Sequence, residues 1–145
     1  MSHIITVASI AAADLGLKAH AENNPKMNKY HNYGLPFGKM KERPQWVMSI
    51  PLVVTSGILG VWAAGLIDKK SADYSEVKQT ALSLILAGGI SNVVDRLKRG
   101  YVVDYLNNPK AKGKAKNFFF NLGDVAIWIG SGVYFIWTVM SRHKS

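Results

Sequence analysis

The chain has 145 residues, of which 48% are hydrophobic, and it carries a formal net charge of +9. This length is that of one domain, and the hydrophobic content, with four Trp and six Tyr, excludes a disordered tail. The chain has no cysteine, which excludes disulfides, thiol nucleophiles and thiolate metal sites. Any catalysis must therefore use oxygen or nitrogen groups.

The hydrophobic residues are concentrated in four blocks, and polar segments between the blocks hold most of the charge. A bilayer span needs about 20 predominantly apolar residues. The second and fourth blocks reach that length, the third reaches it with its polar end, and the first is short. We therefore predict an all-α membrane protein, a four-transmembrane-helix bundle with a small extramembrane element that contains β structure. The predicted helices span residues 4–19, 46–67, 77–96 and 118–140 of a single membrane-embedded domain, 1–145.

The positive charge is distributed as in a membrane protein. A nucleic-acid binder gathers Lys and Arg along one face of a soluble fold. Here they lie in the connections between apolar blocks, where anionic lipid headgroups are the natural counter-charge. Membrane lipids are thus expected partners, and nucleic acid is not.

The first block contains Asp14 and Lys18, which are four residues apart and share a helix face. One interpretation is an interfacial ion pair in which Lys18 extends to the headgroups. The other places Asp14 near a functional centre. We do not expect Met1–Ala19 to be cleaved as a secretory signal, because the sequence MSHII has no basic region.

Residues 20–45 form a polar connection whose Pro, Gly and Asn content indicates turns and short strands. Two interpretations stay open: a small aromatic β element lying on the membrane surface like a cradle, or an ordinary interfacial loop. The β element would use Asn32, Tyr33, Gly34, Pro36, Phe37 and Gly38.

The second block carries no charge, and its small residues would let a neighbouring helix approach closely. These residues are Gly57, Gly60 and Ala64. The segment that follows, 68–76, is predicted to be a short charged hairpin.

The third block ends in polar residues. Asn92, Asp95 and Arg96 stand at helical positions i, i+3 and i+4 and share one face. Ionisable groups at membrane depth are costly and tend to pair with one another, so a helix-end pair between Asp95 and Arg96 is expected. Such groups also mark functional sites.

Two further carboxylates have no obligatory cation beside them in the sequence. Asp104 follows a β-branched, aromatic segment that is predicted to be extended. Asn121 and Asp124 open the fourth block, where the positive end of the helix dipole favours a carboxylate. Asp104 and Asp124 are therefore the candidates for chemistry.

In these residues the chain resembles lipoprotein signal peptidase, the signal peptidase II family of membrane aspartyl proteases. Five short segments match the family's pattern in its order along nearly the whole chain. They are Asp14-x-x-x-Lys18, Asn32-x-Gly34-x-x-Phe37, Asn92-x-x-Asp95-Arg96, Gly100-x-Val102-Val103-Asp104-Tyr105 and Phe120-Asn121-x-x-Asp124. Six residues depart from what the family usually has, namely Leu15, Leu17, Pro36, Ser91, Tyr105 and Gly123.

The resemblance implies that Asp104 and Asp124 form a catalytic dyad. Two close carboxyls cannot both ionise easily, so they share a proton, and one acts as base toward water while the other donates to the substrate carbonyl. No metal or other cofactor is implied. The supporting residues would be Asp14, Lys18, Asn32, Gly34, Asn92, Asp95, Arg96 and Asn121.

The implied reaction removes the signal peptide from a diacylglyceryl-modified prolipoprotein, with cleavage before the lipidated cysteine. The implied location is the bacterial cytoplasmic membrane, with a multi-pass, monomeric enzyme and its site toward the outer leaflet. Two alternatives stay open: an inactive paralogue that binds signal peptides or lipoproteins, and a proton- or ion-handling bundle. A relay spreads ionisable groups across membrane depth, whereas here they collect toward one end.

The charge bias disagrees with this orientation. The two connections at the active end carry five Lys and Arg in 20–45 and seven in 95–117, against three in 68–78 and two in the tail. The positive-inside rule would place the active end in the cytoplasm. We follow the resemblance, with both termini cytoplasmic, because some cations are held by the site or by headgroups.

Overall fold

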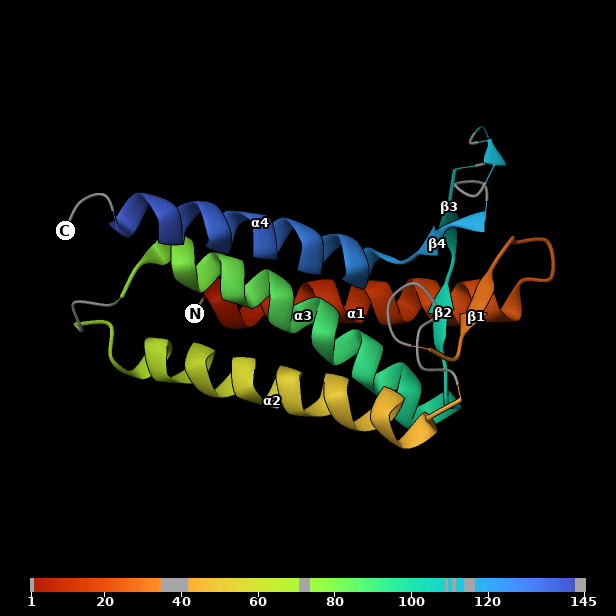
Figure 1. Cartoon of the computed structure of the whole chain (residues 1–145), viewed down its shortest axis with the longest axis horizontal. Coiled ribbons are helices and arrows are strands. Elements are labelled where there is room, and N and C mark those ends of the chain that lie inside the picture. Colours follow the sequence, from red (N-terminus) through yellow and green to blue (C-terminus); the bar gives the residue numbers. More distant parts are fainter. Residues whose placement is uncertain are drawn as a thin grey trace.

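The computed structural model describes residues 2–34, 42–70, 74–108, 110, 112–113 and 117–142. Four long helices lie alongside one another, and both chain ends lie at the same end of the bundle (Figure 1). Each helix is long and apolar enough to cross a membrane. The helices are α1 (Ser2–Asn23), α2 (Pro44–Ile67), α3 (Glu76–Arg99) and α4 (Leu122–Arg142).

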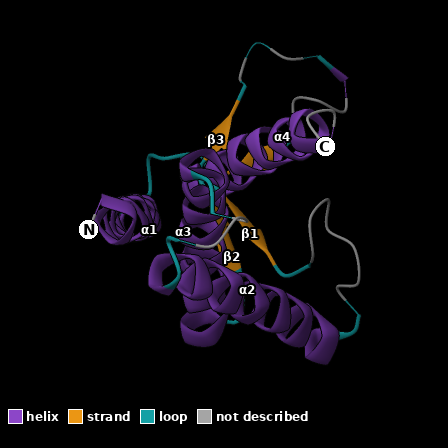
Figure 2. Cartoon of the chain, turned by 90° about the vertical axis from the view of Figure 1, so that its left-hand side faces the viewer, coloured by secondary structure: helices purple, strands orange, loops and turns teal. Residues whose placement is uncertain are grey.

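Helix α3 is the centre of the bundle and packs against each of the other three helices (Figure 2). Half of its apolar window is buried, compared with 6% for α2. Leu86 and Ala87 of α3 are almost fully buried in the main hydrophobic cluster. A helix whose apolar surface is left exposed by its own fold is suited to face lipid, so α2 is the most lipid-exposed of the four.

The ends of α3 are set by local sequence. Ser75 caps its start and accepts a hydrogen bond from the backbone of Lys78, and Glu76 lies in the first turn. Gly100 ends the helix in the left-handed conformation, with φ of 79°, which glycine adopts without a steric penalty. The chain therefore reverses sharply and returns toward the helix as an extended strand.

Two short antiparallel sheets lie at the end of the bundle opposite the termini (Figure 1). Strand β1 (Tyr30–Asn32) pairs with β2 (Val102–Asp104), with Tyr30 opposite Asp104. Strand β3 (Leu106–Asn107) pairs with β4 (Phe119–Phe120). The prediction of a four-helix membrane bundle with a small β-containing element is confirmed.

Several element boundaries differ from the prediction. Helix α1 is longer at both ends, and Glu76 belongs to α3 and not to the hairpin predicted before it. Phe119 and Phe120 form a strand. Helix α4 begins only at Leu122, because the side chain of Asn121 caps its start. Residues 71–73 of the predicted hairpin, and positions 36–38 of the predicted β element, lie outside the described residues.

The contact between α2 and α3 does not use the predicted small residues. Positions Gly57 and Gly60 face open space. The Trp62 indole instead donates to Ser83 Oγ at 2.8 Å, and Gln79 Nε2 donates to the Trp62 carbonyl at 2.7 Å. Polar pairing between these helices replaces the close backbone approach that the glycine spacing suggested.

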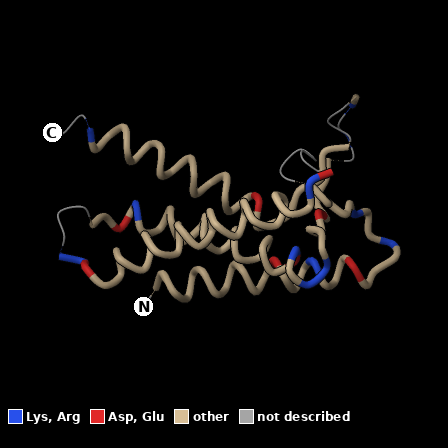
Figure 3. The backbone as a smooth tube through the Cα atoms, turned by 60° about the horizontal axis from the view of Figure 1, so that its bottom comes forward, with Lys and Arg blue, Asp and Glu red and all other residues tan. Residues whose placement is uncertain are grey.

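Charged residues gather toward the two ends of the bundle, as expected for spanning helices (Figure 3). A few lie inside it. Asp14, Lys18 and Asp95 have fully buried side chains, and Arg96 and Asp104 are nearly so. This internal group adjoins the two small sheets and forms the candidate site.

Candidate active site

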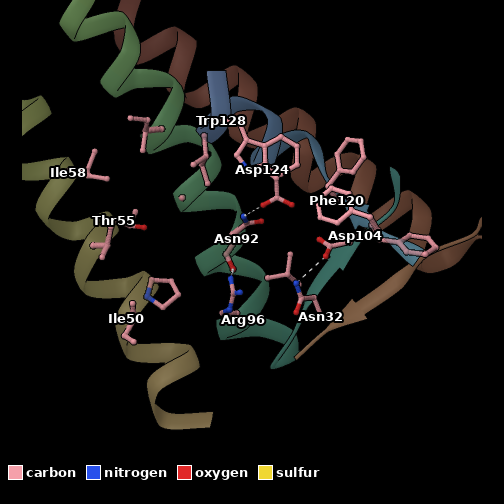
Figure 4. A pocket seen from close by; sticks show the side chains of 18 residues that line it. Asn32, Ile50, Thr55, Ile58, Asn92, Arg96, Asp104, Phe120, Asp124 and Trp128 are labelled. Carbon is pink, nitrogen blue, oxygen red and sulfur yellow. Dashed lines mark hydrogen bonds between the residues drawn. The ribbon is translucent and has the colours of Figure 1, made fainter. Parts of the chain in front are cut away.

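A cavity of about 350 Å³ opens between α2 and α4, with α3 behind it (Figure 4). Ile50, Val54 and Ile58 of α2 line one side, and Phe120 and Trp128 line the other. Most of the lining is apolar. The polar groups that reach the cavity are Asn32, Thr55, Asn92, Arg96, Asp104 and Asp124.

Asp104 is placed by the turn after α3. Asp95 Oδ2 accepts a hydrogen bond from the backbone of Val103 at 3.0 Å, which anchors strand β2 to the helix. Asp104 is 2% exposed; its Oδ1 accepts from Asn121 Nδ2 at 2.7 Å and its Oδ2 accepts from Asn32 Nδ2 at 3.2 Å. Burial, and secondarily the nearby Asp124 carboxylate, raise the pKa of Asp104 from 3.8 to about 7. This carboxyl is therefore able to hold a proton near neutral pH.

Asp124 lies in the first turn of α4, in a reciprocal cap with Asn121. Asn121 Oδ1 accepts from the backbone of Asp124 at 2.9 Å, and Asp124 Oδ2 accepts from the backbone of Asn121 at 3.2 Å. Asp124 Oδ1 also accepts from Asn92 Nδ2 at 3.0 Å. These donors fix the position of the carboxylate at the start of the helix.

The two carboxyls face the same cavity (Figure 4). Among the described residues no hydrogen bond joins them directly, and Asn121 links them by donating its side chain to Asp104 and its backbone to Asp124. No cation contacts either carboxylate within salt-bridge distance in this described part of the chain. The arrangement leaves two acidic groups open to a molecule placed between them.

Asn92 connects this pair to a second buried cluster. Its Oδ1 accepts from Lys18 Nζ at 2.7 Å and from Asn121 Nδ2 at 3.3 Å, while its Nδ2 donates to Asp124. Because an ammonium group repels an amide NH₂, Lys18 favours the orientation of the Asn92 amide that presents NH₂ to Asp124.

The interfacial interpretation of Lys18 is wrong. Lys18 and Asp14 are both 0% exposed, and Lys18 Nζ lies 2.8 Å from Asp14 Oδ2. The ammonium also donates to Ser91 Oγ at 2.9 Å, besides its bond to Asn92. Its three hydrogen atoms are thereby all used, and the side chain points into the bundle and not toward headgroups.

The predicted ion pair between Asp95 and Arg96 is also wrong. Consecutive helix residues point about 100° apart, so their side chains do not face each other. Asp95 pairs with Arg99, one turn along, and lies 3.7 Å from Lys18. Arg96 instead donates to the carbonyls of Asn92 at 3.3 Å and Gly34 at 3.0 Å.

Hydrogen bonds of Asn32 and Arg96 hold the segment after β1 against the site. Asn32 Oδ1 accepts from the backbone of Gly34 at 3.0 Å, which forms a tight turn and turns the Gly34 carbonyl toward Arg96. Arg96 Nε is buried and has no hydrogen-bond partner in the described structure. Buried donors are normally hydrogen-bonded, so an unpartnered one on a residue that lines the cavity makes Arg96 a candidate for ligand binding.

Two site residues have no role in the sequence-based prediction. The Tyr105 hydroxyl donates to Asp14 Oδ1 at 2.8 Å, and Ser91 Oγ donates to Asp14 Oδ2 at 2.6 Å. Each stands beside a predicted site residue in the sequence, Asp104 or Asn92. No local pattern indicated that both would meet a carboxylate of the first helix.

The structure thus divides the predicted residues into two adjoining groups. One lines the cavity and contains Asn32, Asn92, Arg96, Asp104 and Asp124, and the fully buried Asn121 supports it by donating to Asp104. The other is buried behind Asn92 and contains Asp14, Lys18 and Asp95. In the described part of the chain, no group of His, Asp or Glu is arranged to hold a metal ion, and the groups that donate to the two cavity carboxylates are amides.

The signal peptidase (SPase) II family model matches residues 4–140. The chain belongs to the signal peptidase II family. It is 36% identical over 117 residues to the lipoprotein signal peptidase of Shewanella oneidensis, covering 79% of this chain and 64% of that protein. It is 32% identical over 120 residues to the lipoprotein signal peptidase of Halalkalibacterium halodurans, covering 82% of this chain and 71% of that protein.

Two solved structures, both described as bacterial membrane enzymes studied by the in meso method, share the fold. One, at 2.3 Å resolution, has a TM-score of 0.80 at 19% identity and covers 99% of this chain and 91% of its own. The other, at 1.9 Å, has a TM-score of 0.74 at 20% identity and covers 94% and 92%. With its four spanning helices, this signal peptidase II family member is a multi-pass membrane protein.

Proposed function

We propose that the chain is a membrane aspartyl endopeptidase that removes the signal peptide from diacylglyceryl-modified prolipoproteins, cutting before the lipidated cysteine. The observation that carries the proposal is the pair of carboxyls, Asp104 and Asp124, which face one cavity with amide donors and, among the described residues, no contacting cation. Membership of the signal peptidase II family and the name of its lipoprotein signal peptidase relatives support the substrate class.

The pair supports hydrolysis by an activated water. In the reactive state the two carboxyls share one proton, which Asp104 is suited to hold because its pKa is raised to about 7. The Asp124 carboxylate takes a proton from water, water oxygen bonds to the scissile carbonyl carbon, and Asp104 donates its proton to the carbonyl oxygen. The tetrahedral intermediate then collapses as the scissile C–N bond breaks: the nitrogen takes the proton held by Asp124, and one hydroxyl of the intermediate returns its proton to Asp104 as the carbonyl forms. The products are a signal peptide carboxyl group and a free amine on the lipidated cysteine.

The surroundings of the pair suit an apolar substrate. The cavity lies between α2 and α4 and is lined mainly by aliphatic and aromatic side chains, including Ile58 and Trp128. A signal peptide is an apolar helix and diacylglyceryl tails are lipid, so both can enter from the bilayer. Arg96, which lines the cavity and has an unpartnered Nε, would donate to a substrate carbonyl. Asn32, Asn92 and Asn121 donate to the catalytic carboxyls and hold them in place.

We further infer the location and state of the enzyme. The chain works as one membrane-embedded domain, as a monomer surrounded by membrane lipids in the bacterial cytoplasmic membrane. Its cavity is at the outer leaflet, with the two termini on the cytoplasmic side. Support comes from the termini lying at the bundle end opposite the sheets (Figure 1), although the Lys and Arg bias favours the reverse.

A cleavage assay tests the activity. Purified protein in detergent is incubated with a prolipoprotein that carries the diacylglyceryl group, and with the same prolipoprotein without it. We expect mass spectrometry to find a product that begins at the lipidated cysteine only from the modified substrate. Asp124→Asn is the matched inactive control. Binding of the substrate without cleavage by the wild-type chain would favour the binding-only alternative.

A labelling experiment tests the orientation. Lys70 and Lys112 are both exposed and lie toward opposite ends of the bundle. Each is changed to cysteine in the naturally cysteine-free chain, and intact cells are treated with a membrane-impermeant thiol reagent. We expect labelling at position 112 and protection at position 70. The opposite pattern would overturn the proposed orientation.

A further inference from the structure

Two hydroxyl groups that face away from the cavity converge on the buried Asp14 carboxylate. The Tyr105 hydroxyl donates to Asp14 Oδ1 at 2.8 Å, and the Ser91 hydroxyl donates to Asp14 Oδ2 at 2.6 Å. The three side chains come from separate parts of the fold, α1, α3 and the segment after β2. The contact therefore ties α1 and α3 to the segment that carries Asp104.

Tyr105 joins the two carboxyls through short stretches of backbone. It follows Asp104 directly, and its hydroxyl also accepts from the backbone of Leu122 at 3.1 Å. Leu122 is the first residue of α4 and lies two residues before Asp124. Adjacent residues of an extended segment point to opposite sides, so Tyr105 holds the back of the segment whose front presents Asp104. One hydroxyl thus bonds Asp14 on one side and the start of α4 on the other.

Ser91 influences Asp124 through Lys18 and Asn92. Its oxygen accepts from Lys18 Nζ at 2.9 Å while donating to Asp14. These contacts, with the Asp14 carboxylate, hold the ammonium where it reaches Asn92 Oδ1 at 2.7 Å. The Asn92 amide then has its NH₂ directed to Asp124. The orientation of this amide depends on where Lys18 is held.

We propose that Tyr105 and Ser91 are positioning residues for the peptidase reaction: through Asp14 and Lys18 they set the orientation of the Asn92 amide and the placement of Asp104 relative to Asp124. This rests on the proposed function of the cavity. Neither hydroxyl touches the substrate cavity, so neither is a catalytic residue.

Tyr105→Phe and Ser91→Ala each remove one hydroxyl and little volume. For each we expect kcat per folded molecule to fall about tenfold, with KM changed less than twofold, because only the arrangement of the carboxyls is disturbed. Both substitutions act through Asp14, so the double variant should lose less than the product of the two single losses.

Matched variants separate positioning from folding. Tyr74→Phe removes a tyrosine hydroxyl that donates to a carboxylate, Glu76, at 2.6 Å at the far end of the bundle. Ser83→Ala removes a buried serine hydroxyl from the same helix as Ser91, bonded to Trp62 and the Gln79 carbonyl. Both are expected to keep wild-type kcat per folded molecule, even where the melting temperature falls.

The side-chain NH₂ signals of Asn92 in the ¹⁵N NMR spectrum, assigned by their loss in Asn92→Ala, give a readout that needs no activity. They should shift in Tyr105→Phe and Ser91→Ala and stay in place in the two controls. Unchanged kcat, or unchanged Asn92 signals, in both hydroxyl variants would overturn the proposal. A wild-type chain that does not cleave would sink the proposed function, while shifted Asn92 signals would still support orientation of this amide by the hydroxyls.

Discussion

The buried carboxylates of this chain fall into two groups a few side chains apart. Asp14 and Asp95 contact cations: Lys18 reaches both, and Arg99 pairs with Asp95. Within the described part of the chain, Asp104 and Asp124 receive only amide and backbone donors, and both face the cavity. The same side chain thus serves in two environments.

The difference teaches what a carboxylate needs to be reactive in this fold. A buried carboxylate with a contacting cation holds structure together, because removing its partner leaves an uncompensated buried charge. A buried carboxyl without a contacting cation holds its proton more readily and is available for acid and base steps. Asn92 separates the groups, accepting from Lys18 and donating to Asp124.

The largest expected effect comes from removing a cavity carboxylate. Asp104→Asn and Asp124→Asn keep the side-chain shape but cannot exchange the proton. Each should lower kcat by about a thousandfold or more. The double variant should be little worse than either single one, because the two groups act as a unit. The rate of prolipoprotein cleavage measures this, and normal cleavage by either single variant would contradict the dyad.

The next effect is on stability and comes from the other group. Lys18→Met leaves the Asp14 carboxylate buried without its cation, which should cost about 3–5 kcal/mol. We expect the melting temperature in detergent to fall by about ten degrees or more. Adding Asp14→Leu should restore part of this loss, since an apolar pair has no uncompensated charge. If Lys18→Met were as stable as the wild type, the distinction between cation-paired and cavity carboxylates would be contradicted.

The pH dependence sharpens the comparison. The pKa of Asp104 is raised from 3.8 to about 7, so its proton is held below pH 7 and lost above it. Cleavage should fall about tenfold per pH unit well above 7. The folded chain binds more protons than the unfolded chain between about pH 4 and 7, so this group's contribution to stability declines as pH rises through that range. Asp104→Asn should flatten that decline in melting temperature, and an activity plateau extending to pH 9 would contradict the assignment.

The smallest effect is expected from Arg99, the cation that pairs with Asp95. Arg99 is partly exposed, and Asp95 keeps Lys18 and the Val103 backbone as partners when Arg99 is removed. Arg99→Gln should change kcat less than twofold and stability by about 1 kcal/mol or less. Cleavage and thermal unfolding in detergent check both values. A loss of activity as large as that of Asp104→Asn would place Arg99 in the reaction.

The sequence by itself determined the spanning helices and predicts the candidate pair of carboxyls. In a bilayer the backbone N–H and C=O groups of a long apolar block must be hydrogen-bonded within the segment, as they are in a helix. This part of the fold therefore depends on local composition alone. Asp104 and Asp124 were singled out because no cation stands beside them in the sequence. Apolarity alone predicts that the fourth helix begins at residue 118, whereas the Asn121 cap makes α4 begin at Leu122.

Only the tertiary structure decided which buried charges neutralise one another. Asp95 and Arg96 are neighbours in sequence, yet helix geometry turns them apart and gives Asp95 to Arg99 and Lys18. Contacts between residues about 70 to 90 positions apart, such as those of Asp14, leave no local pattern.

Three departures from the family pattern illustrate this, because in the sequence they are unrelated. Ser91 and Tyr105 both bond Asp14, and a Cβ at Gly123 would come within 2.7 Å of the same carboxylate. The absence of a side chain at Gly123 lets α4 approach Asp14 at the place where the two hydroxyls meet it. These three residues meet because α1, α3 and α4 pack around the Asp14 carboxylate. No property of a single segment brings them together.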